Sequence, residues 1–203
     1  PLSTMAAADA LEKMLDDCDA KVLFLSQQYR DLVEPYEDRL GKLIKGGRIA
    51  YDFRRAGWRD FEEWLERASD APFEAPIDRL DDFNIIYSSG TTGLPKGILH
   101  SHMMRDMLAV RFGAFEYGPD TISLASTPLY SNTTLVAVLA TVGLGGTTIL
   151  MPRSDVVKFL EIAQRERVTH AMLVPVQYQR ILAHPDFDTY DLSAFKAKLS
   201  TSA

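Results

Sequence analysis

Residues 83–97 read FNIIYSSGTTGLPKG, and this stretch indicates both the fold class and the chemistry of the chain. Its first half, FNIIYSS, is an apolar run of strand length. The second half is too rich in Gly, Thr and Pro for either a helix or a strand. We therefore expect a loop over residues 88–97, between a strand that ends near Ser89 and a helix that begins near Ser101.

The predicted loop has the side chains of a phosphate cradle. Its glycines allow close approach of the backbone to a ligand, and backbone amides in such a turn can converge on an anion. Lys96 adds a point cation with no carboxylate beside it in sequence. The hydroxyl groups are Ser88, Ser89, Thr91 and Thr92, and the glycines are Gly90, Gly93 and Gly97.

Other phosphate loops do not fit this stretch. The P-loop of NTPases needs GxxxxGK followed by Ser or Thr, but Pro95 precedes Lys96 and Gly97 follows it. The dinucleotide pattern GxGxxG fails because Gly90 and Gly93 are three residues apart. A flexible surface loop is the remaining alternative. Ten positions have the residue types and the order that a phosphate cradle needs, and this favours the cradle.

Strand-like and helix-like segments alternate along the chain, which predicts an α/β fold with a mostly parallel sheet flanked by helices. An exposed connector is expected over 70–79, so that residues 1–80 form a first α/β segment and residues 81–203 a second one with the phosphate loop. Helices are expected over 7–17, 29–44, 58–68 and 132–144, from about 101, after Ser154 or Asp155, and from Pro175. Pro35 is expected to divide or start the helix over 29–44. Strands are expected over 21–25, 48–53, 83–89, 121–125, 147–151, 168–174 and 199–201.

Composition excludes several classes of protein. The chain has 203 residues and 46% hydrophobic content, enough for a sizeable core. Its net charge of −6 argues against a surface for nucleic acid or anionic membrane. No apolar run has membrane-spanning length, and the N-terminus does not resemble a signal peptide. A single cysteine, Cys18, fits a reducing compartment, so we expect a cytoplasmic protein.

Several conspicuous residues have ordinary structural interpretations. Cys18 continues the helical spacing of Leu11 and Leu15 and is expected to be buried. His100 and His102 lack accompanying metal ligands, so packing at the helix start or support of the loop is expected rather than a metal site. Arg105, one turn into the helix, is expected to be solvated or salt-bridged, while Trp58 and Trp64 are expected in the core.

The stretch SSGTTGLPKG, preceded by an apolar strand and followed by ILHSH, resembles the phosphate-loop signature of the adenylate-forming superfamily. That superfamily includes acyl- and aryl-CoA synthetases, firefly luciferase and the adenylation domains of peptide synthetases. The chain is most similar to AMP-dependent acid–CoA ligases. Weaker resemblance extends over PLSTMAAADALEKMLDDCDAKVLF (1–24), TPLYSNTTL (127–135), VTHAMLVPVQYQRIL (168–182) and KLSTSA (198–203).

The resemblance implies a two-step reaction. A carboxylate attacks the α-phosphate of ATP, with Mg²⁺ sharing the phosphate charge, and pyrophosphate leaves. The CoA thiol then attacks the acyl-adenylate and AMP leaves. Lys96 and Thr91 are the catalytic candidates by this resemblance. The residues expected to contact the β- and γ-phosphates are Ser88, Ser89, Gly90, Thr91, Thr92, Gly93 and Lys96.

The resemblance also implies sites for the acid and the adenine. Tyr130, Ser131 and Asn132 correspond to the acid-pocket segment, where many relatives carry an aromatic residue followed by His. Ser131 replaces that histidine, so a gating histidine is not carried over and the acid stays unspecified. Ser202 and Ala203 fall where relatives have a Gly-Gly-Ala-Pro turn beside the adenine, but Thr201-Ser202 departs from the two glycines.

Later motifs of the superfamily do not occur in the sequence, so the chain is expected to be part of the large N-terminal domain and inactive alone. The expected partners are a small carboxylic acid, ATP, CoA and the remainder of its own chain. Two alternatives remain open. One is an adenylation domain that loads a carrier protein. The other is a non-catalytic nucleotide-binding fragment.

Overall fold

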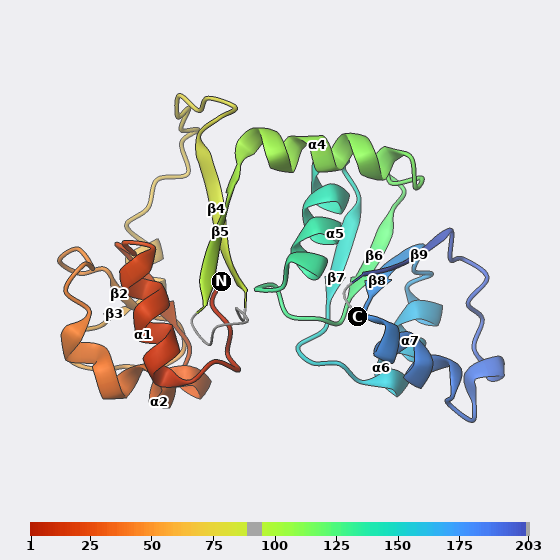
Figure 1. The fold of residues 1–203 in the computed structure, drawn as a ribbon, viewed down its shortest axis with the longest axis horizontal. Coiled ribbons are helices and arrows are strands. Elements are labelled where there is room, and N and C mark those ends of the chain that lie inside the picture. Colours follow the sequence, from red (N-terminus) through yellow and green to blue (C-terminus); the bar gives the residue numbers. More distant parts are fainter. Residues whose placement is uncertain (89–94, 202–203) are drawn as a thin grey trace. The chain divides into compact units, whose positions relative to one another are not determined.

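The computed structural model describes residues 1–88 and 95–201, which form two compact units (Figure 1). The first unit comprises Pro1–Ile77 and Ile85–Leu99, and the second comprises Asp78–Asn84 and His100–Ala203. The strands β4 (Asp82–Ser88) and β5 (Lys96–Ser101) pass through both units. Each unit is described by itself below.

The first unit contains a small parallel sheet in the order β1-β2-β3. Leu23 pairs with Arg48 and Ile49 pairs with Arg59 in its register. Its strands are β1 (Leu23–Leu25), β2 (Arg48–Ala50) and β3 (Arg59–Asp60), and its helical elements are α1 (Ala8–Asp17), η1 (Gln27–Tyr29), α2 (Arg30–Val33), η2 (Glu34–Arg39) and α3 (Phe61–Leu65).

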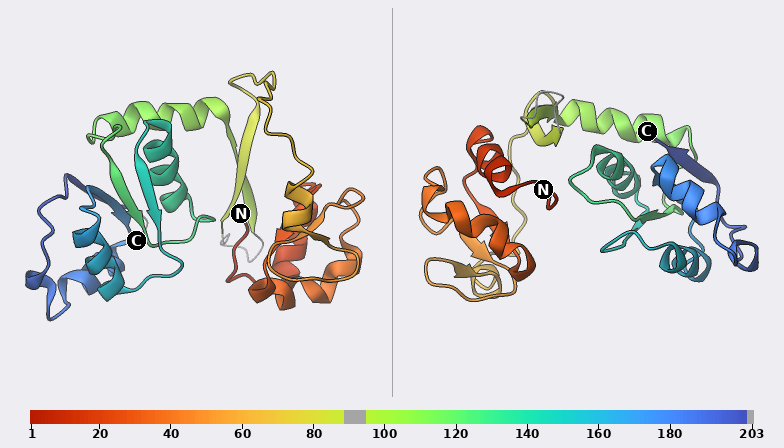
Figure 2. Two further views of the ribbon diagram at one scale, coloured as in Figure 1. Left: turned by 180° about the vertical axis from the view of Figure 1, so that it is seen from behind. Right: turned by 60° about the horizontal axis from the view of Figure 1, so that its bottom comes forward.

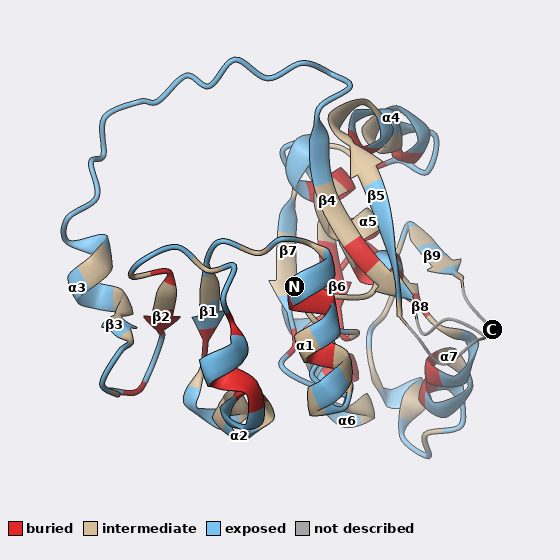
Figure 3. Cartoon of the chain, turned by 60° about the vertical axis from the view of Figure 1, so that its left-hand side comes forward, coloured by how far each residue is buried: buried red, intermediate tan, exposed pale blue. Residues whose placement is uncertain are grey.

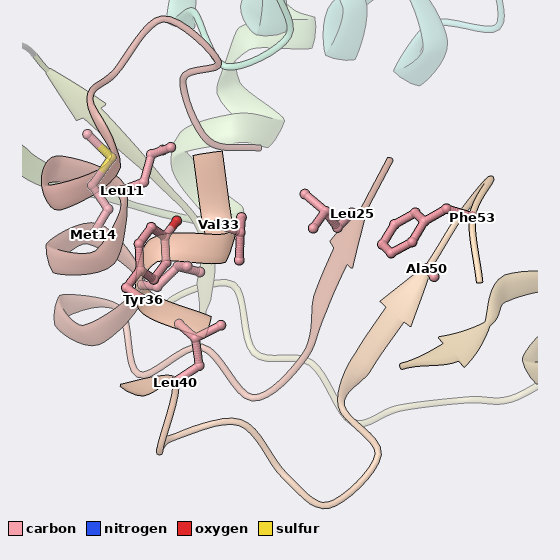
Figure 4. Close-up of a cluster of buried hydrophobic side chains, with 9 residues drawn as sticks. Leu11, Met14, Leu25, Val33, Tyr36, Leu40, Ala50 and Phe53 are labelled. Carbon is pink, nitrogen blue, oxygen red and sulfur yellow. The ribbon is translucent and has the colours of Figure 1, made fainter. Parts of the chain in front are cut away.

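The core of the first unit forms under α1. Leu11, Met14 and Leu15 recur at helical spacing and are all buried, which gives α1 one apolar face (Figure 3). Figure 4 shows Leu11 and Met14 beside Tyr36, whose side chain is only 1% exposed. Side chains from η2, β1 and β2 complete this cluster. The prediction of an amphipathic helix over 7–17 is confirmed.

Three predictions for the first unit are wrong in detail. The helix expected over 29–44 ends early, at Arg39; its expected division at Pro35 is confirmed, since α2 ends at Val33 and a 3₁₀ helix begins at Glu34, because Pro35 has no N–H for the α-helical ladder. The helix expected over 58–68 spans only Phe61–Leu65 and buries none of its residues. Cys18 follows the end of α1 and is half-buried, with its Sγ 3.7 Å from the carbonyl of Leu15.

The two tryptophans differ from the core positions expected for them. Trp64 packs edge-on against Phe24, with ring centroids 5.5 Å apart, but Phe24 is itself 51% exposed, so this pair lies at the surface of the unit. Trp58 is half-buried against the core cluster, and its Nε1 donates a hydrogen bond of 2.6 Å to Glu37. The apolar stripe predicted over residues 58–68 is thus only partly covered by the rest of the unit.

The second unit contains a four-stranded sheet in the order β7-β6-β8-β9, with every neighbouring pair parallel. Its strands are β6 (Ile122–Ala125), β7 (Thr147–Leu150), β8 (His170–Leu173) and β9 (Ala197–Ser200). Its helices are α4 (His102–Gly113), α5 (Asn132–Gly143), α6 (Val156–Arg165) and α7 (Pro175–Leu182), with a short 3₁₀ turn η3 (Phe187–Thr189). The predicted α/β class with mostly parallel strands is confirmed.

Helices cover both faces of this sheet (Figure 2). Leu124, Ala171 and Leu173 share a buried cluster with residues of α6 and α7. The alternate strand positions face α5, because Ser123 accepts a hydrogen bond of 2.9 Å from Thr141 and Met172 packs beside Ala140. The alternation of side chains along β6 and β8 therefore places the sheet between two helical layers.

Local signals set the helix starts in the second unit as predicted. The carboxylate of Asp155, not the hydroxyl of Ser154, caps α6 by accepting from the amide of Lys158 at 3.0 Å. Pro175 occupies the first turn of α7, where its missing N–H has no cost. Ser101 caps α4 by accepting from the amide of Met104 at 3.3 Å.

One strand was not predicted. The loop expected over 88–97 was to lead directly into the helix at Ser101, but residues Lys96–Ser101 form β5, which pairs with β4 in a two-stranded sheet. Figure 1 shows β5 running back along β4 to the start of α4. The phosphate-loop segment therefore connects two strands rather than a strand and a helix.

Candidate functional site

The β4–β5 pair brackets the predicted phosphate loop. Ser88 is the last residue of β4 and Lys96 is the first residue of β5, and both are exposed. The other predicted phosphate contacts lie outside the described residues: Ser89, Gly90, Thr91, Thr92 and Gly93. The structure thus places the two ends of the predicted cradle on paired strands.

Lys96 has its ammonium group available for an anion. Among residues 1–88 and 95–201, no carboxylate lies within salt-bridge distance of it, and its residue is exposed. A lysine at the start of a strand, without a counter-charge, suits a compact anion such as a phosphate group.

Tyr87 attaches β4 to the end of α1, a contact that sequence reasoning missed. Its hydroxyl donates to Oδ2 of Asp17 at 2.6 Å and lies 3.1 Å from the carbonyl oxygen of Met14. Burial, followed by the bond to Asp17, raises the pKa of the Tyr87 hydroxyl, which therefore stays protonated as a donor. The partners of Tyr87 are about 70 residues away, so no local pattern could indicate them.

Gly97 lies in tight contact with this anchor. A Cβ added at Gly97 would be 3.0 Å from Cγ2 of Ile85, 3.2 Å from Cε1 of Tyr87 and 3.3 Å from Oδ2 of Asp17. The absence of a side chain at Gly97 lets β5 lie against Tyr87 while Tyr87 remains bonded to α1. The glycine expected to serve ligand approach thus has a packing role.

The predicted acid-pocket residues meet at the start of α5. Ser131 is the N-cap residue, but its side chain makes no capping hydrogen bond, and Asn132 is the first residue of the helix. Tyr130 and Ser131 are half-buried, while Asn132 is exposed. Ser202 and Ala203, predicted beside the adenine, lie outside the described residues.

Arg105 is neither solvated nor salt-bridged, contrary to expectation. Its residue is 8% exposed, and no ion pair links it to a carboxylate in the described part of the chain. Nε donates to Oδ1 of Asn84 at 2.9 Å and Nη1 donates to Oδ1 of Asn132 at 3.0 Å. Burial lowers the pKa of the guanidinium from its usual value. The expectation failed because both partners are neutral amides distant in sequence.

The two histidines near the loop differ in their surroundings. His102 begins α4, and its ring packs edge-on against Phe83, with 5.0 Å between centroids. This agrees with the packing expected at the helix start. His100 is half-buried in β5. No group of three or more His, Cys, Asp or Glu residues in the described ranges could hold a metal ion. No helix within those ranges has the length and apolar character needed to span a membrane.

Comparison with known proteins places this arrangement in context. A sequence model described as AMP-binding enzyme matches residues 1–203. The chain is 30% identical to an indoleacetate–CoA ligase of Aromatoleum aromaticum, covering 97% of this chain and 38% of that protein. It is 30% identical to 4-coumarate–CoA ligase 2 of Petroselinum crispum, covering 100% of this chain and 38% of the ligase. The chain therefore spans less than half the length of these relatives.

Solved structures show the same fold. The anthranilate CoA ligase AuaEII in complex with anthranoyl-AMP aligns with a TM-score of 0.89 and 25% identity, covering all of this chain and 40% of that one. ATP-bound MatB from Rhodopseudomonas palustris aligns with a TM-score of 0.82 and 25% identity, covering all of this chain and 39% of that one.

Proposed function

Because the chain belongs to the AMP-binding enzyme family, we propose that it forms part of the large N-terminal domain of an ATP-dependent acid–CoA ligase. The complete enzyme joins a carboxylate to AMP, releasing pyrophosphate, and then transfers the acyl group to the CoA thiol, releasing AMP. Its partners are a small carboxylic acid, ATP, CoA and the rest of its own chain, and we place it in the cytoplasm.

The observation that carries this proposal is the bracketing of SGTTGL (89–94) by two paired strands, with Ser88 at one end and Lys96 at the other. Ser88 and Lys96 are both exposed, and their hydroxyl and ammonium groups are donors of the kind that bind phosphate. The anchoring of Tyr87 to α1 holds the strand from which the loop starts. These features fit the triphosphate of ATP.

Within this proposal, the chain supplies orientation and charge stabilisation. Lys96 pairs with the β- and γ-phosphates, the hydroxyls of the loop donate to their oxygens, and Thr91 assists at the reacting phosphate. These donors would stabilise the negative charge that develops on the leaving pyrophosphate. Mg²⁺ would supply charge neutralisation when bound with the phosphates, since it prefers phosphate oxygens, water and one or two carboxylates to all-protein cages.

The acid would lie at the start of α5, beside Tyr130, Ser131 and Asn132. Ser131 is small and offers a hydroxyl where many adenylate-forming relatives carry histidine, so acid orientation would rest on hydrogen bonding rather than on an imidazole. The adenine would lie near Ser202 and Ala203. Two relatives act, by their names, on indoleacetate and 4-coumarate, so aromatic acids are the first to test.

The decisive experiment is acid-dependent ATP–pyrophosphate exchange by the complete protein, screened over aromatic and aliphatic acids. We expect exchange with a subset of acids, followed by thioester formation when CoA is added. Exchange without transfer to CoA, but with transfer to a carrier protein, would support the adenylation-domain alternative. ATP binding without exchange for any acid would identify a non-catalytic nucleotide-binding protein.

A further inference from the structure

The guanidinium of Arg105 is buried, and no carboxylate among residues 1–88 and 95–201 forms an ion pair with it. Its hydrogen-bond partners are the side-chain oxygens of Asn84 and Asn132, both neutral. Nη2 is buried and has no acceptor in the described part of the chain, and the same holds for the amide nitrogen of Asn84. Within the described residues, the hydrogen bonds of the Arg105 guanidinium therefore go to two neutral amide oxygens.

This arrangement is unfavourable for folding compared with a neutral side chain at the same position. Burying a cation without a paired anion loses hydration that two amide oxygens restore only in part. The bond to Asn132 also holds the positive charge at the N-terminal end of α5, where the helix dipole is positive. Stability alone therefore does not account for an arginine here, which makes a role in the site the better explanation.

The contacts of Arg105 identify that role. Asn84 lies on β4, four residues before Ser88. Asn132 begins α5 and directly follows Tyr130 and Ser131, the proposed acid-pocket residues. A planar guanidinium can reach both amide oxygens at once, whereas an ammonium on a flexible stem does not match this fork. One side chain thus attaches the first turn of α5 to β4.

We propose that Arg105 is a positioning residue that sets the placement of the acid-pocket segment 130–132 by holding Asn132 against β4. The proposal rests on the proposed function, because it takes segment 130–132 to contact the acid. The other end of β4 is held separately, through the bonds of Tyr87 to α1. Loss of Arg105 should therefore disturb acid binding while leaving ATP binding largely intact.

The test uses Arg105→Lys and Asn132→Ala in the complete protein, with Arg111→Gln as the control. Arg111 lies on the same helix but is exposed. In acid-dependent pyrophosphate exchange we expect Arg105→Lys and Asn132→Ala each to raise the KM for the acid about tenfold, with the KM for ATP changed less than twofold. The double variant should be no worse than Asn132→Ala alone, because the Arg105–Asn132 contact is already lost in that variant. Arg111→Gln should match the parent protein.

A second measurement is independent of activity. The amide of Leu135 donates to the carbonyl of Ser131 at 3.0 Å and reports closure of the first turn of α5. Its hydrogen exchange should accelerate in Arg105→Lys and Asn132→Ala but not in Arg111→Gln.

Three results would overturn the proposal. They are equal rises in the KM for the acid and the KM for ATP, a loss of activity proportional to the loss of folded protein, and an unchanged rate of hydrogen exchange at the amide of Leu135. If the parent protein shows no exchange with any acid, the proposed function fails first. The assignment of segment 130–132 to the acid then fails with it, whatever the amide of Leu135 shows.

Discussion

At the scale of single residues, Lys96 is the side chain on which the proposed chemistry depends most. Its proposed partners, the β- and γ-phosphates, are present while the acid attacks ATP and have left as pyrophosphate before CoA attacks. We expect Lys96→Ala to slow adenylation by about one to two orders of magnitude. Thioester formation from preformed acyl-adenylate should be unchanged, as measured by assaying the two half-reactions separately.

Two further variants define the role of Lys96. Lys96→Arg should restore adenylation only partly, since a planar fork does not reproduce a compact ammonium. Lys158→Ala, which removes an exposed lysine from α6, should affect neither half-reaction. Equal losses in both half-reactions of Lys96→Ala would show that Lys96 is structural.

Gly97 offers a test of packing at the same scale. Gly97→Ala would bring Cβ within 3.0 to 3.3 Å of Ile85, Tyr87 and Asp17. The ring of Tyr87 cannot swing away without breaking its bonds to α1, so we expect a loss of about 1–3 kcal/mol in the free energy of unfolding. Urea denaturation checks this against Gly113→Ala. An added Cβ there meets nothing within 4 Å in α4, and a gain of about 0.5–1 kcal/mol is expected.

At the scale of secondary-structure elements, the side chain of Asp155 caps the N-terminus of α6. Asp155→Ala removes the acceptor for the amide of Lys158, and we expect the free energy of unfolding to fall by about 1 kcal/mol. Asp155→Asn keeps a good capping oxygen and should recover most of the loss. Thermal or urea unfolding measures both variants, and an unchanged stability in Asp155→Ala would show that water caps the helix equally well.

At the scale of the whole molecule, pH dependence should reflect buried His170. The His170 side chain is 0% exposed; Nε2 donates to the carbonyl of Phe115 at 2.9 Å, and Nδ1 lies 2.7 Å from the hydroxyl oxygen of Thr169. Burial lowers the pKa of His170 and so favours the neutral ring in the folded protein. The unfolded chain therefore takes up the proton first, so stability present above the usual value of about 6.5 is lost as pH falls.

Urea denaturation between pH 7.5 and 5 tests this expectation. The parent protein should lose at most about 1.4 kcal/mol per pH unit below pH 6.5 through this residue. His170→Gln should start from a lower stability but show a flatter profile over the same range. An equally steep profile in the variant would assign the pH dependence to other groups.

The proposed activity belongs to a molecule larger than these 203 residues, since the chain spans 38% of the length of two ligases that it matches. We therefore expect the purified 203-residue chain to show no acid-dependent ATP–pyrophosphate exchange. Exchange by this chain alone would refute the assignment of essential groups to the remainder of the enzyme.

Local sequence signals were sufficient for much of the fold. The apolar run of β4, the capping residue Asp155, Pro175 at the start of α7 and the alternation of strands with helices act between near neighbours. The prediction of a phosphate loop rests on local sequence as well, because its glycines, hydroxyls and lysine are adjacent in the chain. Family membership followed from the same stretch.

Features that depend on distant partners could not be predicted in this way. β5 forms because it pairs with β4, although Lys96 and Gly97 by themselves indicate a loop. Arg105 reads as a solvated charge on a helix, and its burial depends on asparagines 21 and 27 residues away. Trp64 lies on an amphipathic stripe, and its ring partner Phe24 of β1 is itself 51% exposed. In each case the energy comes from contacts between segments far apart in the chain, which only folding brings together.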